Sequence, residues 1–350
     1  MQWRQAKLPL SMSGVGLQSA EDMAAIAYST SLLSSSSRIH DLLNPGGEQP
    51  AAVLPLSLLQ VLSNKMQEDV TVESLSGVTQ KMATFKFNQR QHQLLLDDLT
   101  DQREVARVKC LGNPRSGDWL TVVPSPSLGL LLRGQEFTMA LRYRLGVPVY
   151  SQEAPCPACN LQSDVMGDHA LGCGSQGERI ARHNLLRDAL YQTAVSASLA
   201  PVKEGRFLLP GRDARPADLL IPRWAGGKDA CLDVTEVSPL QRAMVQGAAT
   251  TDGFALQKAF DRKISKAGED CRQAGLAFIP LAADTLGGWH RVANEQVTKL
   301  AVAQARQIGE MEDVTTRMLR QRLSLLLMKG NSALLIGRVP EEQNEDDGLE

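Results

Sequence analysis

The chain has 350 residues, of which 43% are hydrophobic and 4% aromatic, and it carries a formal net charge of −2. A chain of this length commonly folds into two or three small domains, and the cores here must consist mainly of aliphatic side chains. No stretch of about 18 consecutive apolar residues occurs, so we expect no membrane span and no membrane partner. The near-neutral charge counts mildly against proteins that bind nucleic acid through a strongly basic surface.

The N-terminus and the cysteine usage indicate an intracellular protein. Residues 1–5 lack the basic-then-apolar pattern of a secretory signal peptide. Three of the six cysteines lie within 18 residues of one another beside a histidine. In a reducing compartment such clustering favours a metal site over disulfides. We therefore expect a nuclear or cytoplasmic protein that is not secreted.

The first 150 residues are predicted to form a mainly helical region. Helical periodicity extends over about 88–111 and stops at Gly112-Asn113-Pro114. A further helix is predicted over 135–145. Between these two helices, residues 119–123 fit a strand or an extended connection.

From residue 178 onward, predicted helices and strands follow one another more regularly. We expect a helix over 178–197, strands over 206–209, 217–221 and 230–238, a helix over 253–274, a strand over 276–281, and helices over 290–308 and 312–328. This α-β-β-β-α-β order predicts a small mixed sheet flanked by helices, so the fold class is expected to be α+β (mixed α/β). The acidic tail over 339–350 is expected to be disordered.

A block rich in proline and glycine, residues 151–177, contains the pattern Cys156-x2-Cys159-x9-His169-x3-Cys173. A Cys-x2-Cys pair on a tight turn points both sulfurs at one metal ion, and the histidine with the last cysteine supplies a second pair. Four protein ligands leave no open position for water, so we interpret the block as a structural zinc knuckle. The alternative is two free cysteines beside an unrelated cysteine and histidine.

Two carboxylates occur inside otherwise apolar strand candidates, Asp218 in the second and Asp233 in the third. Aspartate is rarely buried without a partner. Two successive strands could place both carboxylates at one end of a sheet, where they would bind Mg²⁺ or Mn²⁺ for phosphodiester hydrolysis. Strand alternation puts Glu236 on the face opposite Asp233, which makes Glu236 the weaker candidate ligand. The alternative is that each aspartate caps a strand end or pairs with an arginine.

A nuclease site also needs a cation near the scissile phosphate. The helix predicted over 253–274 offers Lys258, Arg262, Lys263 and Lys266. Three of these form a stripe at i, i+4 spacing, whereas Lys263 lies about 100° around the helix from Arg262. Lys258 and Arg262 are candidate nucleic-acid contacts, and a solvated basic face is the alternative.

The motif Arg182-His183-Asn184 lies on the helix predicted just after the knuckle. Arg182 and His183 are candidate nucleic-acid-binding residues, and His183 could also support the site. The alternative is that His183 is an ordinary, partly buried histidine.

In chain order, these motifs together resemble one family: Cys-Cys-His-Cys, Arg-His-Asn, Pro216-x-Asp218, Asp233-Val-Thr and Lys263-x2-Lys266. Over about 155–285 the chain resembles the restriction-enzyme-like endonuclease region of site-specific non-LTR retrotransposon proteins. In that family a zinc knuckle precedes a PD-(D/E)xK-type nuclease, which nicks target DNA and so primes reverse transcription. The 14 residues between the two aspartates fit the family's spacing.

The resemblance implies a role for each matching residue. Asp218 and Asp233 would bind a catalytic Mg²⁺ or Mn²⁺. Lys266, ahead of Lys263, would be a catalytic lysine that has moved from the strand to the helix. DNA would be the substrate, and RNA of a retroelement a further partner.

The segment 8–17 resembles the part of such proteins that follows the polymerase palm, but the Tyr/Phe-x-Asp-Asp polymerase motif is absent. The expected organisation is a mainly helical region over 1–150 related to the post-palm part of a reverse transcriptase, a zinc knuckle over 151–177, a restriction-endonuclease-like domain over 178–285, C-terminal helices over 286–338 and the acidic tail over 339–350.

Three functions remain open at this point. The first is a metal-dependent DNA-nicking endonuclease of the PD-(D/E)xK type. The second is a catalytically inactive, zinc-stabilised nucleic-acid-binding module, which is favoured by Ala267, where the family usually has an aromatic residue. The third is a folded remnant without activity. The pattern of residues does not distinguish a monomer from an oligomer.

Overall fold

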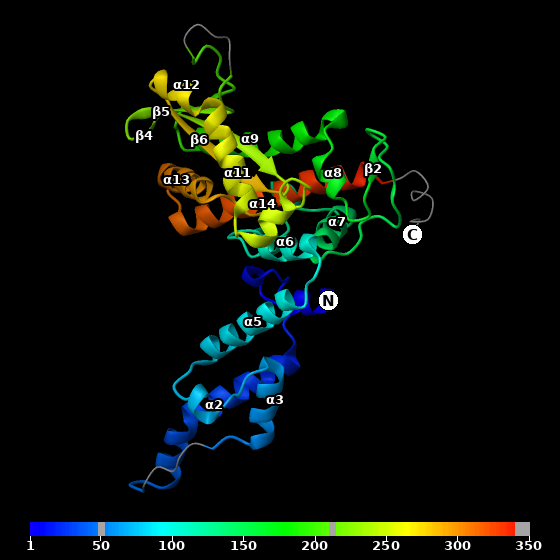
Figure 1. Ribbon diagram of the computed structural model, residues 1–350. Coiled ribbons are helices and arrows are strands. Elements are labelled where there is room, and N and C mark those ends of the chain that lie inside the picture. Colours follow the sequence, from blue (N-terminus) through cyan, green and yellow to red (C-terminus); the bar gives the residue numbers. More distant parts are fainter. Residues whose placement is uncertain (48–52, 210–214, 340–350) are drawn as a thin grey trace. The chain divides into compact units, whose positions relative to one another are not determined.

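The computed structural model describes residues 1–47, 53–209 and 215–339 of the chain (Figure 1). The chain divides into two compact units, Met1–Thr100 and Asp101–Glu350. The boundary between the units lies inside the helical region predicted over 1–150. The finer domain boundaries expected from the sequence stay predictions.

Among the described residues of the first unit, all regular secondary structure is helical. Ser19 and Thr79 cap two of its helices by accepting backbone N–H groups of the first turn. The helices pack around a core that includes Ile26, Leu62 and Phe87. The helical elements are α1 (Gln2–Lys7), a 3-10 helix (Leu10–Met12), α2 (Ala20–Leu43), α3 (Leu56–Met66), α4 (Val72–Leu75) and α5 (Gln80–Asp97).

The second unit starts with α6 (Gln102–Leu111). The single helix predicted over 88–111 is therefore the end of α5 followed by α6. The break has a local cause, because the Asp101 side chain accepts the backbone N–H of Arg103 and so starts a new helix.

Residues 119–123 do not form the strand that was one of the two sequence alternatives. Asp118–Thr121 form a 3-10 helix in which Trp119 is buried. The backbone N–H of Trp119 donates to Ser324 Oγ over 3.1 Å. This tertiary contact satisfies a group that a strand partner would otherwise satisfy. The next helix, α7 (Gly134–Leu145), is where the sequence predicted it.

A four-stranded mixed sheet lies at the centre of the second unit. The strand order is β3-β4-β5-β6; β4 pairs antiparallel with both β3 and β5, while β5 and β6 are parallel. The elements are α9 (Glu178–Ser196), β3 (Val202–Lys203), β4 (Leu219–Ala225), β5 (Lys228–Val237), α10 (Val245–Thr250), α11 (Phe254–Lys263), a π-helical turn (Ile264–Gly268), α12 (Glu269–Gln273), β6 (Ala277–Asp284), α13 (Arg291–Ile308) and α14 (Glu312–Ile336).

The α+β class and the α-β-β-β-α-β order predicted from the sequence are confirmed. The first strand forms at Val202–Lys203 and not over 206–209. Glu204 and Phe207 have φ of 49° and 58°, a left-handed conformation that interrupts an extended strand. The helix predicted over 253–274 forms as α11 and α12 with a π-helical turn between them.

Strand β5 is covered by helices on both faces (Figure 1). On one face Leu232 and Val234 share a core with Leu186 of α9, and α13 and α14 pack on the same core. On the other face Val237 packs against Leu256 of α11. Alternate residues of β5 therefore face different helices.

Within the described residues no helix combines the length and the apolar character that crossing a membrane requires. Apart from Val339, the acidic tail predicted over 339–350 lies outside the described residues.

The contact between α9 and α14 depends on a glycine. A Cβ atom on Gly330 would stand 2.5 Å from Cγ and 3.1 Å from Cα of Arg182. We expect Gly330→Ala to lower the free energy of unfolding by about 1–3 kcal/mol, because the helices must move apart to admit a methyl group. Urea unfolding followed by circular dichroism measures the change. Gly134→Ala on α7 is the matched control, because a Cβ there meets no atom within 4 Å. Unchanged stability of Gly330→Ala would contradict the close packing.

Candidate metal centre and carboxylate cluster

A short hairpin carries the first two predicted zinc ligands. Strands β1 (Ala154–Pro155) and β2 (Gln162–Ser163) pair antiparallel, and Cys156 and Cys159 lie between them. The turn closes because Asn160 takes a φ of 59° and donates its backbone N–H to the carbonyl oxygen of Cys156 over 2.8 Å. Both sulfurs are thereby held on one tight loop.

The other two ligands come from the start and the end of a short helix. Helix α8 (Asp168–Gly172) carries His169, and Cys173 follows as its C-terminal cap. The helix begins after Gly167, which has a φ of 81°, and Asp164 Oδ2 accepts the backbone N–H of His169 over 2.7 Å. The sequence thus folds locally into a hairpin and one helical turn that face each other.

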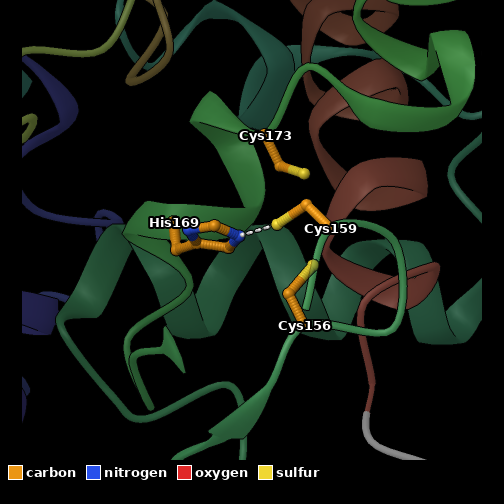
Figure 2. A group of neighbouring side chains, drawn as sticks. All are labelled: Cys156, Cys159, His169 and Cys173. Carbon is orange, nitrogen blue, oxygen red and sulfur yellow. Dashed lines mark hydrogen bonds between the residues drawn. The ribbon is translucent and has the colours of Figure 1, made fainter. Parts of the chain in front are cut away.

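The four side chains converge on one point (Figure 2). One ligand atom from each of Cys156, Cys159, His169 and Cys173 lies within 4.8 Å of the others. His169 Nε2 is 3.3 Å from Cys159 Sγ. Zinc–sulfur bonds of about 2.3 Å hold the sulfurs of a tetrahedral site about 4 Å apart. This group could therefore bind a metal ion such as zinc, and it is the one such group within the part of the chain that the structure describes.

The surroundings of the Cys173 thiol lower its pKa. Burial raises the pKa of this thiol, but the backbone N–H of Ser175 and the Arg338 guanidinium outweigh burial and lower the pKa to about 6. The thiolate is the form that binds metal ions. The surroundings of Cys173 thus favour the protonation state that a zinc ligand needs.

Two ion pairs attach the knuckle to the rest of the second unit. Arg338, which is fully buried, donates to Glu178 Oε1 over 2.9 Å and to the Ser175 carbonyl oxygen over 2.8 Å. Asp168 accepts from Arg103 over 2.6 Å and from the Tyr143 hydroxyl over 3.0 Å. The knuckle is thereby fixed to α6, α7 and the end of α14.

A second group of charged side chains comes from four different elements. His183 of α9 places Nε2 2.9 Å from Oδ1 of Asp218, which immediately precedes β4. Lys263, the last residue of α11, places Nζ 2.6 Å from Oδ2 of Asp233 in the middle of β5. The backbone N–H of Val234 donates to Asp218 Oδ2 over 2.7 Å. This last bond fixes the Asp218 carboxylate against β5, because Val234 is the residue that follows Asp233 in that strand.

Glu236 is a member of this group that strand alternation had made a weak candidate. Its Oε1 is 3.6 Å from His183 Nδ1, and it is buried without a hydrogen bond to any described residue. Strand alternation does predict its contact with α9. Glu236 lies on the same face of β5 as Leu232 and Val234, and this face packs against α9, which carries His183. We refer to the set Asp218, Asp233, Glu236, His183 and Lys263 as the carboxylate cluster.

The cluster shifts the protonation of two of its members. Burial raises the pKa of Asp233, Lys263 opposes this shift, and Asp218 adds to it. Burial lowers the pKa of His183, but its contacts with Asp218 and Glu236 reverse the effect and raise the pKa to about 10. At neutral pH His183 is therefore protonated, and the cluster combines three carboxyl groups with two cations.

The structure places the two candidate catalytic lysines in different surroundings. Lys263 contacts Asp233, whereas Lys266 is exposed and forms no ion pair with a described residue. Lys266 lies in the π-helical turn Ile264–Gly268. Because a π turn holds more residues than an α turn, Lys266 does not return to the face of the helix that Lys263 occupies.

The candidate nucleic-acid contacts lie in different environments. Arg182 is 3% exposed and donates to Asn331 Oδ1 over 2.9 Å, so it supports the packing of α9 on α14. Lys258 lies over the ring of Phe254, 5.6 Å from its centroid. Arg262 is exposed on α11.

Comparison of the chain with protein-family models and with curated proteins gave no match. The resemblance to a retrotransposon endonuclease therefore rests on the sequence motifs.

We expect the purified protein to hold one zinc ion per chain, and Cys173→Ser to lose it. Structural zinc contributes on the order of 10 kcal/mol of apparent binding free energy. Loss of the ion should therefore lower the thermal unfolding midpoint as well. Inductively coupled plasma mass spectrometry measures the zinc, and melting with and without a chelator measures the stability.

Cys110→Ala is the control for this test, because Cys110 is a buried thiol of α6 outside the four-residue group. It should keep the zinc. Equal zinc contents in Cys173→Ser and the unsubstituted protein would contradict the assignment.

Proposed function

We propose that this chain is a metal-dependent DNA endonuclease that nicks its target by phosphodiester hydrolysis. The main support is the carboxylate cluster, in which Asp218 just before β4 lies against Asp233 of the neighbouring strand β5, and Lys263 reaches Asp233 from α11. Hydrolysis of a phosphodiester needs carboxylate oxygens to hold a hard cation and a positive group near the phosphate. The cluster supplies both kinds of group.

The donor set fits Mg²⁺ or Mn²⁺, which prefer carboxylate oxygens. Asp218 and Asp233 are the residues that would hold the ion. Asp233 Oδ1 has no hydrogen bond to a described residue, and each oxygen of Asp218 accepts only one, so lone pairs remain available. A bound ion would supply electrophilic activation of the phosphate and of water.

The protein's own cations have separate roles in this proposal. Lys263 holds a positive charge beside Asp233, where its ammonium group can donate to a phosphate oxygen or orient the attacking water. His183 lies between Asp218 and Glu236. It thereby orients the Asp218 carboxylate and partly neutralises the two acids.

The biological setting follows from the motif resemblance alone. In this setting the protein would nick target DNA so that a site-specific non-LTR retroelement can start reverse transcription. The element's RNA would be a further partner, and the reaction would take place in the nucleus or cytoplasm. The zinc knuckle would serve as a structural element that completes the fold next to α9.

A second candidate function is a zinc-stabilised nucleic-acid-binding module without catalysis. One observation favours it: Asp233 already pairs with Lys263 and Asp218 with His183, so the carboxylates are neutralised by protein cations. Such pairs stabilise buried acids whether or not a metal ion binds.

We expect Asp218→Asn and Asp233→Asn each to reduce Mg²⁺-dependent nicking of supercoiled plasmid by at least about 100-fold, because each removes a charged metal ligand. Lys263→Ala should reduce nicking by about 10- to 1000-fold, since one preorganised group for the developing charge is lost. The rate of conversion from supercoiled to open-circular plasmid is the measurement.

Matched variants separate chemistry from folding and general charge. Asp261→Asn and Lys266→Ala change exposed residues near Lys263 and should nick at the unsubstituted rate. Zinc content and plasmid binding should persist in all five variants. Nicking at the full rate by the Asp218→Asn, Asp233→Asn double variant would rule out the endonuclease, and DNA binding without any nicking would support the second function.

A further inference from the structure

Two open cavities on the second unit meet at a pair of arginines outside the carboxylate cluster. The first cavity, of about 940 Å³, is lined by α11, the start of α13 and the turn around Asn113. The second, of about 1270 Å³, lies between the segment 121–130 and α14. Arg115 and Arg320 line both cavities. The two arginines therefore lie where the two cavities adjoin, and we refer to the pair as the arginine wall and to the two cavities together as the groove.

Arg115 sits on a loop that its surroundings hold in place. Asn113 Nδ2 donates to Asp284 Oδ2 at the end of β6 over 3.3 Å. A Cβ atom on Gly287 would stand 2.8 Å from the carbonyl oxygen of Ser116, so the loop packs directly on the turn that follows β6. Arg115 has a φ of 77°, which costs on the order of 1 kcal/mol in a residue with a side chain. This fixed loop presents an exposed guanidinium that pairs with no carboxylate of a described residue.

Arg320 approaches the same place from α14. Its Nη2 donates to Thr298 Oγ1 of α13 over 2.6 Å, whereas its buried Nε has no hydrogen-bond partner among the described residues. Burial lowers the pKa of Arg320, and the like charge of Arg115 lowers it further. Asp118 acts in the opposite direction, but it forms no ion pair with either arginine within the described chain.

Over both cavities the lining carries as many carboxyl groups as cations, so the excess of positive charge is local. It lies where Arg115 and Arg320 share the single carboxyl group of Asp118. A partly buried cation carries a desolvation cost that a bound anion would offset. Guanidinium groups bind phosphate through paired N–H donors, which makes phosphate a better match than a small hard anion.

The first cavity also has aromatic rings and a lysine in its lining, which a free phosphate ion would not need. Phe260 and His290 stack with ring centroids 4.3 Å apart, and both line this cavity. Lys258, over the ring of Phe254, lines it as well. Aromatic rings next to cations are typical of surfaces that bind the bases and backbone of nucleic acids.

We propose that Arg115 and Arg320 form a phosphate-anchoring site for the backbone of a nucleic-acid strand. The inference rests on the proposed function and deepens it, because it names a surface that holds the substrate away from the scissile phosphate. None of the five residues of the carboxylate cluster lines this groove. Binding at the arginines is therefore separable from cleavage.

The test uses Arg115→Gln, Arg320→Gln and the double variant of the full chain. Fluorescence anisotropy measures binding to labelled single-stranded DNA and to the corresponding duplex, without divalent metal and over a range of KCl concentrations. Each single variant should weaken binding about three- to tenfold near 0.1 M KCl, because one phosphate contact is lost. The slope of log Kd against log salt should fall by about one per arginine removed.

Arg306→Gln is the matched control, because it removes an exposed arginine of α13 that lies outside both cavities. Arg115→Lys and Arg320→Lys keep the charge and should retain most of the salt slope. Zinc content and urea midpoints show that the variants are folded.

The outcomes separate this inference from the proposed function. Equal affinities and slopes for the double variant and the control would overturn the arginine site, whatever the nicking assay shows. The same holds if the unsubstituted protein binds neither probe. Loss of binding by the double variant would support the arginine site. Intact binding without nicking by Asp233→Asn would support the catalytic role of the carboxylate cluster. A loss confined to one probe identifies whether the anchored strand is single or paired.

Discussion

Burial of strand β5 on both faces determines where the charged residues of this protein can lie. An ionised carboxylate in such a strand needs a cation or several hydrogen-bond donors. Asp233 finds Lys263 on the α11 side, and Glu236 finds His183 on the α9 side. Each pairing forms only when its own helix packs on the sheet, and the whole cluster needs both helices. The carboxylate cluster is consequently a product of the completed fold and not of any single element.

The sequence predicted the elements whose signals are local. Apolar periodicity marked α9, α13 and α14, and Pro239 follows the end of β5. The strand predicted over 217–221 instead forms as Leu219–Ala225 and continues past Pro222. The spacing of Cys156, Cys159, His169 and Cys173 predicted a group that the fold brings together. These predictions succeed because a tight turn or a helical face depends mainly on residues close in the chain.

The errors concern features that depend on distant partners. Trp119 joins a 3-10 helix because its backbone N–H meets Ser324 of α14, far along the chain. The contact between Lys263 and Asp233 was not predicted either, because it joins α11 to β5 and lies just before a π-helical turn that the sequence pattern did not indicate. Arg115 and Arg320 had no motif at all, since only the packing of α14 beside the 113–118 segment brings them together.

The two charged regions of the second unit differ in how far their charge is already balanced. In the carboxylate cluster each acid has a cation within ion-pair distance or a backbone donor, so the group is stable without a ligand. At the arginine wall, burial and the like charge of Arg115 lower the pKa of Arg320, and neither arginine forms an ion pair with a carboxylate of a described residue. An anion gains more free energy where the protein has left a cation unpaired. In the function that we propose, a nucleic-acid strand would therefore draw its affinity mainly from the arginine wall, and the cluster would contribute chemistry more than binding.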